Sequence, residues 1–173
     1  DAIDEIGHHS TSDTSVFSAN GISVKLSALH PRYYFAQHEA VMAELLPRIK
    51  RLCLQAKQYN IGLSIDAEEA YRLDISLDIF QALAKDIDLN HWQGLGFVLQ
   101  AYQKRAPDTA KWLISLAKDT NRRIMVRLVK GAYWDAEIKH AQELGLENYP
   151  VFTRKANTDL CYQYCAGILL DAQ

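Results

Sequence analysis

Long apolar runs are missing from this sequence, and neither sign of charge is in large excess. No stretch approaches the roughly 18 apolar residues of a membrane-spanning helix, and the N-terminus has no signal-peptide pattern. The formal net charge is -2, from 19 basic and 21 acidic residues. Such a mixed balance argues against nucleic acid as the main partner. We therefore expect a soluble protein of the cytoplasm.

Cysteine is scarce, with only three residues and no spacing that suggests a disulfide framework. An odd count of this kind fits a reducing compartment. Cys161 and Cys165 lie four residues apart on a predicted helix, but no second Cys or His pair has a matching spacing. We expect no metal site and interpret both as small buried residues.

Phosphate-binding loops and nucleophile motifs are also lacking. Gly94-Leu95-Gly96 comes before a predicted strand, whereas a dinucleotide fingerprint follows one, and no third glycine has the right spacing. No Gly-Lys-Ser/Thr loop occurs, and no serine lies in a nucleophile elbow. The sequence therefore gives no support for a nicotinamide site, an ATP site or a Ser-His-Asp hydrolase.

What remains is typical of one globular domain. Of the 173 residues, 49% are hydrophobic and 23% charged, as in ordinary soluble proteins. Residues 1–20 form a short helical segment and a polar arm, and residues 21–173 form the domain. Apolar runs predict strands at 22–29, 61–66, 94–100 and from 123 onwards. Helical periodicity and capping residues predict the helices, at about 37–59, 67–85, 107–117, 134–144 and 153–170.

Local signals refine three of these elements. Pro47 predicts a kink or a break in the helix over 37–59. The helix that opens at Ala67 is expected to pause near Asp74 and to restart at Ser76 as N-cap. Gly145 is expected to close the helix that begins at Trp134.

Four repeats of strand and helix imply a parallel sheet with right-handed crossovers. Two architectures fit: an open doubly wound sheet, and part of a (β/α)₈ TIM barrel. The barrel is favoured because Lys25, Asp66, Gln100 and Arg127 each lie within or at the end of a different strand, where barrel enzymes build their sites. A complete barrel needs about 250 residues, so we expect an α/β partial barrel of about four strands.

The stretch from Arg123 to Asp135 is the most informative part of the chain. Arg127 interrupts an apolar run and Lys130 follows just before Gly131. Two cations at the end of a buried strand are costly unless an anion meets them. They could instead extend to water or pair with a carboxylate elsewhere. We favour a site, because polar residues interrupt or end the other three strands too.

Four short motifs carry a specific resemblance to a known family, in which they occur in the same order. Their ranges are 23–33 (SVKLSALHPRY), 65–69 (IDAEE), 100–105 (QAYQKR) and 127–134 (RLVKGAYW). Together they resemble the proline dehydrogenase domain of the bacterial proline utilization A family over residues 21–170. The resemblance implies a distorted (β/α)₈ barrel that holds FAD. Such a domain oxidises L-proline to Δ1-pyrroline-5-carboxylate and passes electrons to membrane quinone.

The resemblance also implies roles for individual residues. Arg127 corresponds to an arginine that hydrogen-bonds the flavin near N5, and Gln100 to an amide that contacts the isoalloxazine. Lys25 corresponds to a lysine near the substrate carboxylate, Asp66 to its acidic partner, and Tyr133 to the aromatic wall beside the proline ring. The remaining cofactor-supporting positions are Val129, Lys130, Gly131, Ala132 and Trp134.

Several parts of the family pattern lie outside these 173 residues. They are the first barrel strand, the later strands with a paired-arginine motif, a DNA-binding domain and an aldehyde dehydrogenase domain. Nucleic acid would therefore be a partner only through a domain absent here. The parent protein would be cytoplasmic or peripheral on the inner membrane.

Two other classes of function stay open. One is a Schiff-base lyase of the TIM-barrel type, with Lys130 or Lys25 as the nucleophilic amine. The other is a non-catalytic fragment. Four strands cut from a barrel leave two open edges, so we expect the isolated chain to be inactive and to self-associate or to cover its edges with its own termini.

Overall fold

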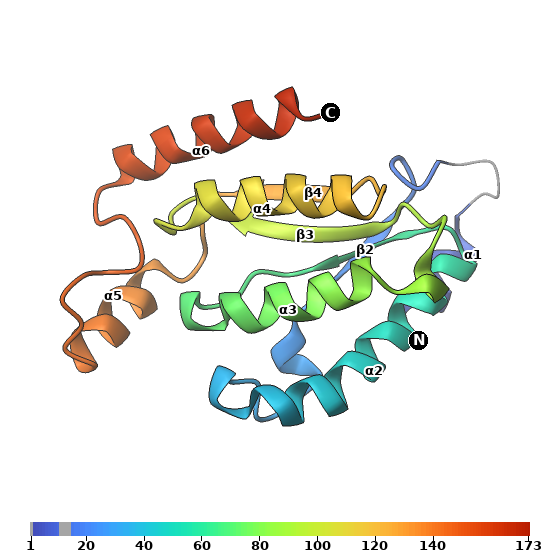
Figure 1. Cartoon of the computed structure of the whole chain (residues 1–173), viewed down its shortest axis with the longest axis horizontal. Coiled ribbons are helices and arrows are strands. Elements are labelled where there is room, and N and C mark those ends of the chain that lie inside the picture. Colours follow the sequence, from blue (N-terminus) through green and yellow to red (C-terminus); the bar gives the residue numbers. More distant parts are fainter. Residues whose placement is uncertain (1, 11–14) are drawn as a thin grey trace.

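A four-stranded parallel sheet forms the centre of the protein (Figure 1). The computed structural model describes residues 2–10 and 15–173. The strands lie side by side in the order of the chain, as β1 (Gly21–Val24), β2 (Gly62–Ile65), β3 (Leu95–Gln100) and β4 (Met125–Val129). All three pairings are parallel. The predicted number and direction of strands are thereby confirmed.

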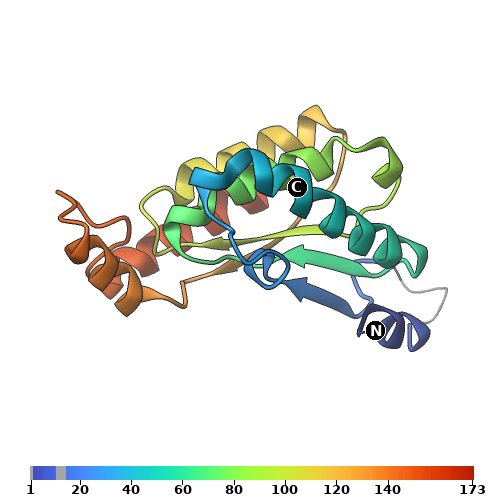
Figure 2. The same ribbon diagram turned by 90° about the horizontal axis from the view of Figure 1, so that it is seen from below.

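Helices connect consecutive strands and lie together on one face of the sheet (Figures 1 and 2). These are α2 (His38–Gln58), α3 (Leu73–Ala84) and α4 (Ala106–Asp119). α1 (Ala2–His8) precedes the sheet, and α5 (Trp134–Glu143) and α6 (Lys155–Asp171) follow it. Short 3₁₀ turns occur between these elements: η1 (Leu26–Ala28), η2 (Phe35–Gln37), η3 (Ala70–Arg72) and η4 (Ile87–Leu89).

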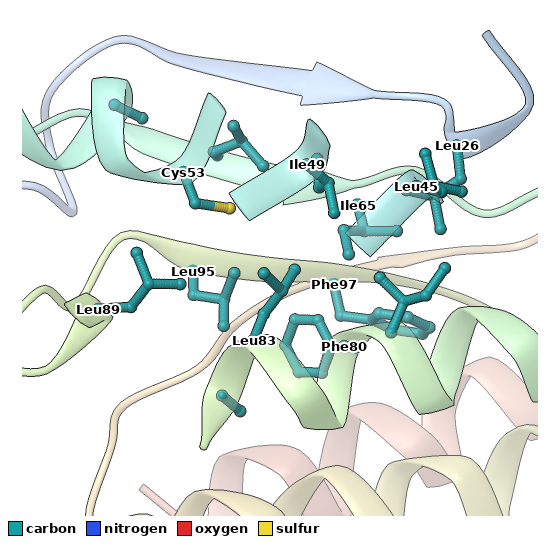
Figure 3. Packing of buried hydrophobic residues seen from close by; sticks show 14 of the residues in the cluster. Leu26, Leu45, Ile49, Cys53, Ile65, Phe80, Leu83, Leu89, Leu95 and Phe97 are labelled. Carbon is teal, nitrogen blue, oxygen red and sulfur yellow. The ribbon is translucent and has the colours of Figure 1, made fainter. Parts of the chain in front are cut away.

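The alternation of side chains along each strand separates a packed outer face from an inner face. Outward residues such as Ile65 and Phe97 are buried against α2 and α3 (Figure 3). The rings of Phe80 and Phe97 meet edge to face, with centroids 5.0 Å apart, a favoured arrangement for aromatic pairs. Burying each large apolar side chain contributes about 1.5–3 kcal/mol, so this face supplies most of the driving force for folding.

Along β4, the register places Arg127 opposite Val98 and Met125 opposite Gly96. These residues point away from the helices, because side chains two apart on a strand share a face. α6 packs on α4 through a second, smaller cluster of buried residues, namely Leu99, Ala101, Ala106, Ala110, Cys161 and Cys165. The helices thus hold the strand ends in place from one side only.

Three local predictions are wrong. β1 ends at Val24 rather than Leu29, because the chain turns into η1 and buries Leu26. Ser76 is no N-cap: it lies inside α3 and its hydroxyl donates to the carbonyl of Leu73. The Glu68-Glu69 pair likewise precedes η3 instead of opening a helix at Ala67.

Pro47 does not break α2 into two pieces, although it lies well inside this helix of 21 residues. Val41, Leu45, Ile49 and Cys53 are fully buried on both sides of it. The helical position of Pro47 costs about 3 kcal/mol. Burial of these four side chains outweighs that cost, since each large one contributes about 1.5–3 kcal/mol.

The polar arm is only partly described, because residues 11–14 lie outside the described ranges. Residues 15–20 of the predicted polar arm contain turns but no helix or strand, and Val16 is buried in the core. The guanidinium of Arg123 lies 4.4 Å from the ring centroid of Phe17. This part of the arm therefore packs beside the start of β4.

Candidate functional site

Asp66 joins two cations from strands that are far apart in the sequence. Its Oδ2 lies 2.7 Å from Lys25 Nζ and its Oδ1 lies 2.6 Å from Arg127 Nη2. The backbone N–H of Asp66 donates to the carbonyl of Val24, just beyond the last pair of the ladder. The carboxylate is therefore set at the C-terminal edge of the sheet, between the two cations.

The two cations remain accessible on the inner face. Their side chains are 49% (Lys25) and 51% (Arg127) exposed, against 21% for Asp66. The hydrogen bond to Asp66 raises the pKa of the Lys25 ammonium above its usual value, so Lys25 stays charged. Its Nζ also lies 6.0 Å from the ring centroid of Tyr133, which places an aromatic face beside the charge.

Gln100 forms a fixed bridge between two loops at the same edge of the sheet. The side chain is 3% exposed. Its Nε2 donates to the carbonyl of Glu68 at 2.8 Å, and its Oε1 accepts from the N–H of Ala132 at 3.2 Å. A primary amide has two donor hydrogens and two acceptor lone pairs. One of each is used here, which fixes the orientation of the amide between the two loops.

The loop after β4 passes close to Tyr102. Gly131 has φ +137°, a value that L side chains rarely adopt, and a Cβ at this position would overlap the ring of Tyr102. The N–H of Tyr102 donates to the carbonyl of Lys130, and that of Ala101 to Val129. Glycine at 131 therefore lets the loop pass against the buried ring.

Lys130 and Trp134 do not join the cluster around Asp66. Lys130 Nζ pairs with Asp159 of α6 at 2.6 Å, and the hydrogen bond to Asp159 raises the pKa of Lys130. The indole N–H of Trp134 donates to the carbonyl of Phe152. Of the ten predicted site residues, Lys25, Asp66, Arg127 and Tyr133 meet at one place. The backbone of Ala132 meets Gln100 nearby.

Glu68 is a carboxylate close to Asp66 in the chain. The sequence predicted it to lie in the first turn of a helix that opens at Ala67. Its side chain is buried, accepts from the N–H of Ser27 at 3.0 Å, and pairs with Arg72 at 2.6 Å. Arg72 in turn lies near the rings of Tyr33, Tyr34 and Tyr71. The only available signal was the Glu-Glu pair at 68–69, shortly after Asp66 and the end of β2.

Glu137 of α5 is a second buried carboxylate that sequence reasoning missed. It is 3% exposed and accepts from the N–H of Ala70. Burial raises its pKa, and the negative charge of Glu69 acts in the same direction, while the bond from Ala70 opposes them. In the described ranges, no group of three or more His, Cys, Asp or Glu residues could hold a metal ion.

The family is decided by comparison with known proteins. The family model for proline dehydrogenase matches residues 1–173. The chain belongs to the proline dehydrogenase family. Among curated relatives, it is 57% identical over 169 residues to the bifunctional protein PutA of Salmonella typhimurium, and 60% identical over 147 residues to that of Rhizobium meliloti. Proline dehydrogenase 2 of Arabidopsis mitochondria is 30% identical over 142 residues.

These relatives are much longer than the chain. The match covers 98% of this chain but 13% of the Salmonella protein, and 85% and 12% for the Rhizobium protein. For the Arabidopsis protein the shares are 82% and 30%. The proline dehydrogenase segment described here thus corresponds to a small part of each relative.

Solved structures agree with this assignment. A crystal structure of a proline utilization A mutant from Bradyrhizobium japonicum superposes with a TM-score of 0.97 at 49% identity, covering 99% of this chain and 18% of that one. Proline utilization A from Bdellovibrio bacteriovorus, inactivated by N-propargylglycine, gives 0.84 at 28% identity, covering 91% and 17%. The four strands and their helices therefore form part of the barrel-like proline dehydrogenase domain, as predicted.

Proposed function

We propose that the chain supplies one half of a flavin-dependent site that oxidises L-proline to Δ1-pyrroline-5-carboxylate, as part of a longer protein. The observation that carries the proposal is the cluster on the inner face, where Asp66 holds Lys25 and Arg127. It lies in a chain whose family is proline dehydrogenase. FAD would take the two electrons from proline, and quinone would be the eventual acceptor.

The residues present fit a flavin. Arg127 has five N–H donors, and both of its described hydrogen bonds use Nη2. The other nitrogens are left to bind a ligand, and the fixed positive charge would stabilise negative charge that develops nearby. Gln100 holds the loop after β4 by accepting from the N–H of Ala132, and Gly131 lets this loop pass against Tyr102. Val129, Lys130, Ala132 and Trp134 would support the cofactor from the same loop.

The substrate side of the site fits an amino acid with an apolar ring. Lys25 is a charged donor held in place by Asp66, so it can attract the carboxylate of proline. Tyr133 lies beside it and would cover the pyrrolidine ring. The sheet excludes water from the site on one side only. The rest of a longer protein would exclude it from the other side.

A Schiff-base lyase receives no support from the two lysines. Each has its pKa raised by a hydrogen bond to a carboxylate, Lys25 by Asp66 and Lys130 by Asp159. A nucleophilic amine must lose its proton at neutral pH, which requires a lowered pKa. Both lysines are therefore suited to charge recognition rather than to attack on a carbonyl.

The location of the longer protein is a further part of the proposal. The described residues include no helix long and apolar enough to cross a membrane. We expect the protein to be cytoplasmic and to reach quinone through peripheral contact with the inner membrane. Nucleic acid would be a partner only through a domain outside these residues.

Arg127→Met in the full-length protein tests the flavin role. We expect bound flavin with a more negative reduction potential and proline oxidation lowered by roughly 10²-fold or more, as for loss of one preorganised charged donor. The assay combines initial rates with a potentiometric titration. Arg105→Met is the matched control, because Arg105 is similarly exposed and pairs with Asp74. Unchanged potential and turnover in Arg127→Met would remove Arg127 from this role.

The isolated 173-residue chain tests how much of the site is present. The outer edges of β1 and β4 have no neighbouring strand among the described residues. A groove of about 1070 Å³ beside β4 is lined in part by Leu113, Ile114, Val126 and Leu128. We expect this chain to self-associate, to bind FAD weakly or not at all, and to show no turnover. Stoichiometric FAD on a monomer would contradict this expectation.

A further inference from the structure

α5 is attached to the rest of the protein by very little apolar surface. Figure 1 shows it at one end of the molecule, apart from the group formed by α2, α3 and α4. Only Glu137 and Ala141 of its ten residues are buried. A helix this short is marginal without packing partners. The way in which Glu137 is bound therefore decides where α5 lies.

Glu137 reaches across to the loop that follows β2. Its Oε1 accepts the backbone N–H of Ala70 at 2.5 Å. Ala70 opens η3, and Glu69 at the N-cap position makes no side-chain capping bond. The carboxylate of α5 thus satisfies a backbone donor that the turn leaves unpaired. This loop is the one that carries Asp66 and Glu68.

Tyr102 is a buried neighbour of Glu137 and of the loop after β4. Its side chain is 2% exposed, and its hydroxyl has no hydrogen-bond partner in the described part of the chain. The charge of Glu137 raises the pKa of this phenol, after the larger effect of burial. The ring packs against Gly131 at the same time. Tyr102 therefore contacts the loop after β4 through its ring and is close enough to Glu137 of α5 to sense its charge.

Glu137 is directly coupled to Tyr133. Tyr133 is the N-cap residue of α5, and its carbonyl accepts the N–H of Glu137 at 2.9 Å. One helical turn thus connects the buried carboxylate to the aromatic ring beside Lys25. Fixing Glu137 on Ala70 fixes the start of α5 relative to the strand ends of β1 and β2.

We propose that Glu137 is a positioning residue, which holds α5 on the loop after β2 through Ala70 and so sets Tyr133 against Lys25. This inference rests on the proposed function, in which Tyr133 covers the ring of proline. Glu137 itself contacts neither substrate nor cofactor in this scheme. The acceptor oxygen is what matters, so a neutral amide can replace the carboxylate.

The test compares three variants of the full-length protein. Glu137→Ala removes the acceptor and Glu137→Gln keeps it. Glu143→Ala removes an exposed glutamate from the end of the same helix, where it pairs with Lys139. We expect KM for L-proline to rise about tenfold in Glu137→Ala, with a smaller change in kcat, as for a buried donor that is left without its acceptor. Glu137→Gln and Glu143→Ala should remain close to the wild type.

Amide hydrogen exchange supplies a readout that does not depend on turnover. In Glu137→Ala, the amides of α5 and of Ala70 should exchange faster by about the same factor as KM rises, and Glu137→Gln should restore protection. If Glu137→Ala does not fold, Glu137→Asp takes its place, because it retracts the carboxylate by one methylene. Partial loss of protection is then expected.

Two results would overturn the inference. One is wild-type exchange in α5 together with wild-type KM in Glu137→Ala. The other is equal impairment of Glu137→Ala and Glu137→Gln, which would make the charge rather than the acceptor decisive. If the wild-type protein does not oxidise proline, the proposed function fails. The exchange comparison still decides whether Glu137 positions α5.

Discussion

Asp66→Asn should separate the stability of the fold from the geometry of the site. The carboxylate accepts from two cations through its two oxygens, Lys25 at Oδ2 and Arg127 at Oδ1. An asparagine keeps one acceptor oxygen and presents an NH₂ group to the other cation. One cation therefore loses its anchor whichever way the amide is turned.

The expected loss of stability is small. Both cations are about half exposed, and such ion pairs contribute about 0.2–1 kcal/mol each. The neutral amide removes the negative charge from both ion pairs, even where one hydrogen bond remains, so the loss is about 0.4–2 kcal/mol. The effect on the reaction should be larger, because displacement of a positioned group by about 1 Å can cost about 10²-fold in rate. We expect kcat/KM for L-proline to fall by about 10²-fold or more, equivalent to about 2.7 kcal/mol.

Asp74→Asn is the matched control. Asp74 makes a two-point contact with Arg105, at 2.6 and 3.0 Å, and its side chain is half exposed. The hydrogen bond from Arg105 lowers the pKa of Asp74, so this pair also stabilises the folded state. Its loss should cost a similar free energy and leave kcat/KM near the wild type.

The assay measures initial rates against proline concentration and the thermal midpoint of each full-length variant. We expect similar shifts of the midpoint in the two variants and very different rates. Equal rates in Asp66→Asn and Asp74→Asn would refute this expectation. So would a midpoint shift in Asp66→Asn large enough to explain its rate by unfolding alone.

Two further predictions concern the backbone at two glycines and the pKa of Glu137. Gly131→Ala should destabilise the fold by about 1–3 kcal/mol, because φ is +137° and the new Cβ would overlap Tyr102. Gly167→Ala, in open space within α6, should instead stabilise it by about 0.5–1 kcal/mol; urea unfolding of both variants measures the difference. Burial raises the pKa of Glu137 above its usual value, and the negative charge of Glu69 acts in the same direction, while the hydrogen bond from Ala70 and the charge of His140 oppose the rise. The folded state therefore favours the protonated form, so wild-type stability should fall relative to Glu137→Gln as pH rises above about 4.5. A gap between their unfolding free energies that stays constant with pH would contradict this.

The sheet and its helices were predictable because their apolar residues follow simple periods. A predicted apolar stripe identified α2, and all of its residues are fully buried except Leu52, which is partly buried. The stripe consists of Val41, Leu45, Ile49, Leu52, Cys53 and Ala56. The end of β1 was not predictable, because Leu26 is apolar and equally suited to a strand or to a buried turn. Where a pattern is compatible with two conformations, tertiary packing chooses between them.

The meeting of Lys25, Asp66 and Arg127 was also predictable in outline. Parallel strands end at one edge of a sheet, so polar residues at those ends converge. Lys130 follows the same strand, yet it turns to Asp159 on α6. Its partner lies 29 positions further along the chain, on a helix whose placement the strand pattern does not specify.

Glu137 could not be found from the sequence at all. Its partner is a backbone N–H, 67 residues earlier in the chain, and a backbone group leaves no residue-type signal. An acidic residue in the first turn of a helix is ordinarily explained by the helix dipole. Only the burial of the carboxylate distinguishes Glu137 from such a residue.

The two faces of the sheet are stabilised by different forces, and this difference bears on how the site works. The outer face is closed by apolar packing, which is complete within the described residues around Phe80 and Phe97. On the inner face, Asp66 holds two cations that are half open to water. Water weakens such interactions, and a covering that excludes it strengthens them several-fold. The chain therefore provides the packed sheet and the positions of the charges. How strongly those charges interact depends on what covers the inner face.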